Sequence, residues 1–167
     1  SVTSEGQKKR KEAQLMVQAA IAIEIVTFAP IRIQNLSTIR LDEHMAWQAD
    51  RLRLSFPAHE VKNDQALDFF LPTEASERIK RYIKDWRSMF IPATNPYLFP
   101  GRNGKPKDQS ALRNQMKKAI FDHTGLQMTP HQFRHAAAKL LLDAKPGHYE
   151  VVRKLLGHKS LTTTYAP

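Results

Sequence analysis

The stretch TPHQFRH, residues 129–135, predicts the start of a helix that carries a basic pair. Thr129 is a suitable N-cap, the proline after it suits the first helical position, and Gln132 completes a Thr-x-x-Gln capping box. Residues three apart on a helix are neighbours, so we expect His131 and Arg134 to converge on one small target. A basic pair near a helix N-terminus suits an anion, and phosphate is the obvious candidate. The opposite, core-facing stripe is expected to be Phe133, Ala137, Leu140, Leu141 and Ala144.

The composition favours a polyanionic partner for a chain of this size. The 167 residues suffice for one domain with a proper core, and 26 Lys and Arg against 16 Asp and Glu give a net charge of +10. An excess of that size indicates nucleic acid first, although many basic proteins are merely soluble. The chain has no cysteine, which excludes disulfides, a thiol nucleophile and a cysteine zinc site, and is compatible with a reducing cytoplasm.

The first part of the chain is expected to hold two helices. Residues 1–10 are polar and predicted to be flexible. An amphipathic helix is expected from Lys11 to Phe28, because Glu12, Gln18 and Glu24 interrupt its apolar residues. No membrane segment is expected, because no stretch is long and apolar enough. A second, short helix is expected over residues 32–38.

A small antiparallel sheet is expected next. Residues 51–56 alternate between polar and apolar, which is the period of a strand, and Pro57 ends that pattern. Two further segments, 59–62 and 67–71, flank a predicted turn at Asn63-Asp64. Helices should follow, the first capped by Thr73, over residues 73–90, 110–123, 130–143 and 149–156, with a loop over 91–109. The predicted fold is therefore α+β and mainly helical.

Four further residues are candidates for phosphate chemistry. Arg32 opens the short second helix, Lys62 lies beside the hairpin turn, His158 follows a helix-ending glycine, and Tyr165 lies near the end of the chain. Each alone has an ordinary interpretation as a surface or packed side chain.

Two other patterns are weaker. His131 and His135 have the i,i+4 spacing of metal ligands, but no acidic residue lies near them, so no metal is expected. Residues 101–105 (GRNGK) lack the full phosphate-loop spacing and do not lead directly into a helix. A basic turn is the better interpretation, and no nucleotide or other cofactor is implied.

Taken in order, these residues resemble the catalytic domain of the tyrosine recombinases, the phage integrase family. The similarity runs from about Lys11 to Ala166 and is strongest in residues 129–134 and in VVRKLLGHKS, residues 151–160. It implies the tyrosine-recombinase, DNA breaking-rejoining fold, with residues 11–167 as the catalytic domain. On this resemblance, the N-terminal core-binding domain common in the family is expected to be absent from these residues.

The resemblance also implies a site and its chemistry. Tyr165 would be the nucleophile that attacks a DNA phosphate and leaves a 3′-phosphotyrosine and a free 5′-hydroxyl, without metal or ATP. Non-bridging oxygens would be stabilised by Arg32, Arg134 and His158. Lys62 would protonate the leaving oxygen, and His131 would help to move the tyrosine proton. The implied partner is double-stranded DNA, bound by a tetramer, in the cytoplasm of a bacterium or encoded by a phage or mobile element.

Three departures from the family pattern keep alternatives open. The interval from His158 to Tyr165 is shorter than usual, Asn35 stands where an acidic residue often follows the first arginine, and the chain ends soon after Tyr165. One alternative is an inactive, DNA-binding remnant of an integrase. A type IB topoisomerase-like enzyme, which shares the chemistry, is another.

Overall fold

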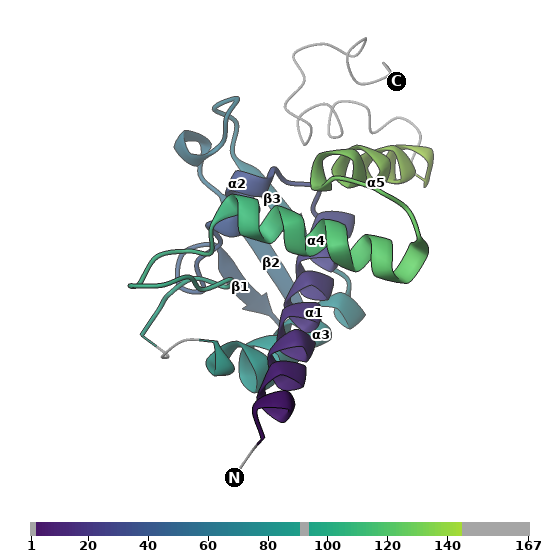
Figure 1. Cartoon of the computed structure of the whole chain (residues 1–167). Coiled ribbons are helices and arrows are strands. Elements are labelled where there is room, and N and C mark those ends of the chain that lie inside the picture. Colours follow the sequence, from purple (N-terminus) through teal and green to yellow (C-terminus); the bar gives the residue numbers. More distant parts are fainter. Residues whose placement is uncertain (1–2, 91–93, 145–167) are drawn as a thin grey trace.

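The computed structural model describes residues 3–90 and 94–144, except for the side chains of residues 140–144 (Figure 1). In this part of the chain, helices cover one face of a small antiparallel sheet. The predicted α+β, mainly helical fold is therefore confirmed. The helix expected over residues 149–156 lies outside the described residues.

Helix α1 (Ser4–Phe28) is the long helix against which α4 and α5 pack (Figure 1). It begins well before Lys11, so the prediction of a flexible segment over residues 1–10 is wrong from the fourth residue onward. The polar start is helical because the Thr3 hydroxyl accepts a hydrogen bond from the backbone N–H of Gly6 (3.2 Å), which caps the first turn. The buried face of α1 comprises Gln18, Ala19, Ile21, Ala22, Ile25 and Val26.

The sheet has three strands, β1 (Met45–Gln48), β2 (Arg51–Phe56) and β3 (Leu67–Phe70), with β2 in the middle and antiparallel to both neighbours. The alternation that predicted β2 is confirmed, because every second side chain of this strand faces the core. The inward side chains are Leu52, Leu54 and Phe56. The outward face, which includes Arg51 and Phe70, is exposed to solvent.

The segment between β2 and β3 differs from the prediction. Ala58–Glu60 forms a short 3-10 turn, η1, so the expected extended segment over 59–62 is wrong. The physical reason is that Pro57 ends the strand and the following residues close i→i+3 hydrogen bonds, including Val61 N–H to the Ala58 carbonyl (3.1 Å). The turn predicted at Asn63-Asp64 is confirmed.

The helical segment after the sheet is less regular than expected. Helix α3 (Thr73–Arg81) continues into the π-helical η2 (Tyr82–Trp86) and the 3-10 turn η3 (Arg87–Met89). Thr73 is the first helical residue and does not cap the helix, because Pro72 occupies the N-cap position. The change of helical period aims the Arg87 guanidinium at backbone carbonyls of the following loop, to which it donates hydrogen bonds.

The remaining helices match their predictions closely. These are α2 (Ile33–Ser37), α4 (Gln109–Thr124) and α5 (Pro130–Ala144). Helix α4 ends at Gly125, whose φ of 70° is the left-handed conformation that favours glycine. Across the described residues, no helix combines the length and the apolar character that a bilayer crossing requires.

The expectation of a basic turn at residues 101–105 is also confirmed. The Lys105 N–H donates to the Arg102 carbonyl (3.0 Å), and Asn103 and Gly104 both have positive φ, as a tight hairpin turn requires. Helix α4 begins only at residue 109, so this turn does not deliver its backbone N–H groups to a helix N-terminus as a phosphate loop does.

Candidate functional site

The start of α5 is built as its sequence predicts. The Gln132 N–H donates to the Thr129 hydroxyl (3.1 Å), and the Thr129 N–H donates to the Gln132 side-chain oxygen (2.9 Å). This reciprocal capping box fixes the first turn of the helix, with Pro130 as its first residue. The core-facing stripe is confirmed for its described members, because Phe133 packs against the core and Ala137 is buried.

Arg134 is buried, although its place beside His131 suggested an accessible cation. Only 3% of it is exposed, and its Nε–H donates to the carbonyl oxygen of Pro30 (2.6 Å). Pro30 lies in the connection between α1 and α2, so this hydrogen bond joins α5 to the segment that leads to Arg32. The pKa of Arg134 is lowered to about 10. Desolvation is the larger cause, and the positive charge of Arg32 is the smaller one.

Arg32 stands at the N-cap of α2 and is half-buried. Desolvation lowers the pKa of its guanidinium too. The Arg134–Pro30 hydrogen bond holds Arg134 against the connection that ends at Arg32, and the positive charge of Arg32 contributes to the lowered pKa of Arg134. The structure therefore brings these two predicted site residues near each other, although they are distant in sequence. Two cations near each other in partly desolvated surroundings attract an anion.

His131 lies at the beginning of α5 and is exposed. Its ring meets that of His135 edge to face, with 4.5 Å between the centroids. His131 and Arg134 thus lie one turn apart on the same helix but differ in burial. Their convergence on one target stays a prediction.

Lys62 lies on the turn between η1 and β3, and its side chain is exposed. The turn is closed by a hydrogen bond from the Asp64 N–H to the Val61 carbonyl (2.9 Å). In Figure 1 this turn, α2 and α5 lie at the same end of the molecule. The other two predicted site residues, His158 and Tyr165, lie outside the described residues.

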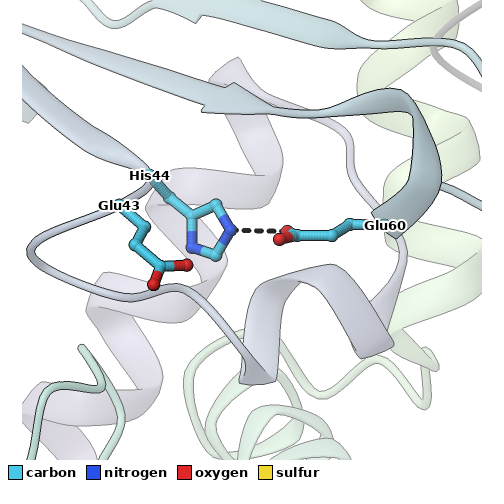
Figure 2. Close-up of side chains that lie close together, drawn as sticks. All are labelled: Glu43, His44 and Glu60. Atoms are coloured by element: carbon cyan, nitrogen blue, oxygen red, sulfur yellow. Dashed lines mark hydrogen bonds and ion pairs between the residues drawn. The ribbon is translucent and has the colours of Figure 1, made fainter.

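A second cluster, which the sequence reasoning missed, adjoins the Lys62 turn (Figure 2). His44 is 3% exposed, and its Nε2 lies 2.6 Å from a carboxylate oxygen of Glu60. Asn35, on α2, is 4% exposed and donates its side-chain N–H to the Glu60 backbone carbonyl (2.9 Å). The sequence shows no periodic or motif signal for this cluster, because its members meet only when the sheet and α2 are assembled.

The same cluster can be tested as a metal site. Ligand atoms of Glu43, His44 and Glu60 lie within 4.8 Å of one another. However, His44 Nδ1 accepts a hydrogen bond from the Arg40 backbone N–H (2.8 Å), so the ring proton belongs on Nε2, where it is donated to Glu60. A metal on Nε2 would move that proton to Nδ1, against the Arg40 N–H. The arrangement fits an internal hydrogen-bonded pair rather than a metal site.

A cleft with a mixed apolar and basic lining lies next to the start of α5. Its volume is about 470 Å³, and its lining includes Lys117 and Lys118 of α4 and Thr129 of the capping box. Lys118 is paired with Asp122 (2.5 Å), whereas the Lys117 side chain is exposed. Surface lysines of this kind suit contacts with a phosphate backbone, which position a nucleic acid without reading its sequence.

Comparison with known families gives one assignment that covers nearly the whole chain. Residues 7–166 match the model of the phage integrase family. The tyrosine recombinase XerC of Xanthomonas axonopodis pv. citri is 30% identical over 159 residues, which are 88% of this chain and 50% of the relative. XerC of Staphylococcus carnosus is 27% identical over 150 residues, or 86% of this chain and 46% of the relative. The chain therefore spans about half the length of these curated relatives.

Solved structures show the same fold. The XerH site-specific recombinase bound to its difH substrate has a TM-score of 0.72 and 22% identity, covering 91% of this chain and 43% of that one. The XerA recombinase has a TM-score of 0.67 and 18% identity, covering 94% of this chain and 59% of its own. At these identities the likeness concerns the fold.

Proposed function

The chain belongs to the phage integrase family, and on that premise we propose that it is the catalytic domain of a site-specific DNA recombinase. Members of the family are DNA strand-transferring enzymes. The proposed reaction cuts and rejoins duplex DNA through a 3′-phosphotyrosine intermediate, and uses neither a metal nor ATP.

The proposed chemistry assigns a role to each predicted site residue. The Tyr165 oxygen attacks the scissile phosphorus, a tyrosine–phosphate bond forms on the 3′ side, and the bond to the 5′ oxygen breaks. His131 helps to remove the tyrosine proton, and Lys62 donates a proton to the departing 5′ oxygen. The cations that stabilise the charge on the non-bridging oxygens are Arg32, Arg134 and His158. Rejoining is the reverse reaction, in which a 5′-hydroxyl attacks the phosphotyrosine and releases the phenol.

The observation that carries this proposal is the Arg32–Arg134 pair. The buried Arg134 donates its Nε–H to the carbonyl oxygen of Pro30, two residues before Arg32, and the charge of Arg32 lowers the pKa of Arg134, so two cations that are distant in sequence lie near each other. A phosphodiester in the transition state carries the charge that such a pair would neutralise. Donors fixed in advance of the reaction stabilise developing charge without reorganisation, and one such donor is worth about 3–4 kcal/mol.

The proposed partner is double-stranded DNA. A net charge of +10 and the lysine-lined cleft beside α5 support binding through the phosphate backbone, which predicts strong salt dependence. We further propose that the complete protein acts as a homo-oligomer, a tetramer, on its DNA. We also propose that it acts in the cytoplasm of a bacterium, which would fit its bacterial relatives.

Adduct trapping tests the proposal directly. The complete natural protein is incubated with a library of nicked suicide duplexes of random sequence, in which cleavage releases a short strand and prevents rejoining. We expect a covalent protein–DNA adduct whose linkage maps to Tyr165 by mass spectrometry, and whose DNA reveals the target sequence. Tyr165→Phe should abolish the adduct, and an adduct that persists in that variant would refute the nucleophile.

Two tyrosines of the described residues supply controls. Tyr82 is 1% exposed, and desolvation raises its pKa to about 12, which suits a core hydroxyl rather than a nucleophile. Tyr97→Phe changes a half-buried tyrosine outside the proposed site and should leave adduct formation intact.

One observation favours a second candidate function, a DNA-binding protein without catalysis. The interval between His158 and Tyr165 is short for the family, and a phenol on too short a connection would not reach the phosphate. Duplex binding without any adduct would support this function. Relaxation of supercoiled plasmid by a single protomer without site preference would instead indicate a type IB topoisomerase-like activity.

A further inference from the structure

The position of Lys62 relative to Arg32 depends on residues outside the predicted site. Lys62 is exposed and lies on a short turn, so its own side chain contributes little to fixing that turn. The turn begins directly after η1, the 3-10 turn that ends at Glu60. The contacts that hold Glu60 therefore determine the position of the Lys62 side chain.

Glu60 is held from two directions. Its backbone carbonyl accepts a hydrogen bond from Asn35 of α2 (2.9 Å), three residues after Arg32. Its carboxylate accepts a hydrogen bond from His44 Nε2 (2.6 Å). The first contact joins the Lys62 turn to the helix that Arg32 begins, and the second joins it to the segment before β1.

His44 is itself fixed on every side. Its Nδ1 accepts the Arg40 N–H (2.8 Å), and its ring stacks on Phe56, with 5.0 Å between the centroids and 26° between the planes. The Ser55 N–H donates to the His44 carbonyl (3.0 Å), which ties the residue to β2. A ring held this firmly gives the Glu60 carboxylate a rigid partner.

Figure 2 shows that Glu60 alone approaches His44 Nε2, whereas the Glu43 carboxylate lies on the other side of the ring. Glu43 pairs with Arg40 (3.3 Å) and has no part in holding η1. The chain thus supplies a matched control, a second carboxylate in the same cluster with a different partner.

We propose that Asn35, His44 and Glu60 are positioning residues that hold Lys62 where it protonates the leaving 5′ oxygen of the phosphate bound by Arg32. This inference rests on the proposed function. It assigns no catalytic contact to the three residues, which act only through the placement of Lys62. A displacement of about 1 Å at a proton donor is enough to cost a large part of the rate.

The test separates loss of proton donation from loss of folded protein. The complete protein is given the duplex recovered by adduct trapping, either unmodified or with sulfur in place of the 5′-bridging oxygen. A thiol, whose pKa is roughly 8.5, leaves as a thiolate and needs no proton donor. Lys62→Ala should therefore be slow on the oxygen substrate and close to wild type on the sulfur substrate.

We expect Glu60→Ala to slow cleavage of the oxygen substrate by about tenfold and to cleave the sulfur substrate at close to the wild-type rate. Glu60→Gln retains an oxygen that accepts from His44 and should restore the rate. Glu43→Gln should match wild type on both substrates. In a Lys62→Ala background, Glu60→Ala should have no additional effect on the oxygen substrate.

The other outcomes overturn the inference in distinguishable ways. If Glu60→Ala slows both substrates equally, or neither, Glu60 does not act through Lys62 although the proposed function stands. If sulfur does not rescue Lys62→Ala, Lys62 is not the proton donor, and the positioning role is refuted with it. If the wild-type protein forms no adduct on either substrate, the proposed function itself fails.

Discussion

The Arg134 guanidinium donates a hydrogen bond of 2.6 Å to the carbonyl oxygen of Pro30, across 104 residues of sequence. This contact joins the helix that carries the predicted His-x-x-Arg pair to the connection that precedes Arg32. It uses the Nε–H, which is one of the five N–H donors of the guanidinium fork. One buried side chain therefore both holds two distant segments together and supplies charge to the proposed site.

The double role of Arg134 predicts that charge alone does not replace it. Arg134→Lys keeps a cation but loses the planar fork that reaches the Pro30 carbonyl, and a buried hydrogen bond from a charged group is worth about 1.5–3 kcal/mol. We expect a loss of that size in the free energy of unfolding, measured with urea, and a fall of about 100-fold in adduct formation. Unchanged stability would show that the hydrogen bond does not hold α5.

Arg32 should act on the reaction through its charge. Arg32→Ala removes one of the cations that the proposed site offers to the phosphate, and we expect adduct formation to fall by about 100-fold. Arg32→Lys keeps the charge but not the planar fork, so it should recover only part of that loss. Full activity of Arg32→Ala would show that this cation does not stabilise the transition state.

The capping box of α5 gives a prediction about stability alone. Thr129→Ala removes the acceptor for the Gln132 N–H, and such a cap is worth about 1 kcal/mol. Because the Gln132 side-chain oxygen accepts a hydrogen bond from the Thr129 N–H and both bonds hold the same turn, the two losses should not add. Urea unfolding of Thr129→Ala, Gln132→Ala and the double variant measures this, and fully additive losses would contradict a reciprocal box.

Much of the fold was predictable because local signals agree with the tertiary structure. In strand β2, buried apolar residues alternate with more exposed ones. The start of α5 carries both residues of its capping box. Strand β1 gave no such signal, because Met45–Gln48 is a short edge strand with one half-buried side chain and three exposed ones. Its pairing with β2 sets its position, and that pairing is not local.

The candidate site was less predictable than the fold. Helical spacing placed Arg134 beside His131 on a polar face, but a backbone carbonyl is the partner that buries it, and a carbonyl has no signature in the sequence. The His44–Glu60 pair spans 16 residues, and its tautomer is set by the Arg40 backbone N–H. Contacts of this kind follow from packing and register, which residue types do not encode locally.

Asn35 offers a prediction that runs against the family pattern. An acidic residue is common at this position, yet the Asn35 side chain donates to the Glu60 carbonyl in this chain. Asn35→Asp would place an unprotonated oxygen against that carbonyl in a buried site, and an unsatisfied buried group costs about 1–3 kcal/mol. We expect lower stability to urea and slower cleavage of the oxygen substrate.

Asn35→Ala provides the comparison for this variant. It also loses the donor but brings no charge, so it should be less destabilised than Asn35→Asp. If Asn35→Asp is as stable as wild type, the carboxylate has found a cationic partner, and the link from α2 to η1 is dispensable.

Lys107 predicts how stability depends on pH. Its ammonium donates to the side-chain oxygen of Gln18 (2.8 Å), which is fully buried, and desolvation lowers the pKa of Lys107, with a smaller contribution from Lys11. Between that lowered pKa and the ordinary value of 10.5, the unfolded chain binds the proton more readily than the native state. The contribution of Lys107 to the free energy of unfolding therefore rises with pH across this window.

A difference measurement isolates this effect. Lys107→Met retains the length of the side chain without its charge, and Gln115 still donates to the Gln18 oxygen (3.1 Å). We expect wild type to gain stability relative to Lys107→Met in urea titrations as pH rises through the window between the lowered pKa and 10.5. The exposed Lys105, changed to Met, should show no such gain, and an equal pH dependence in both variants would exclude Lys107 as its source.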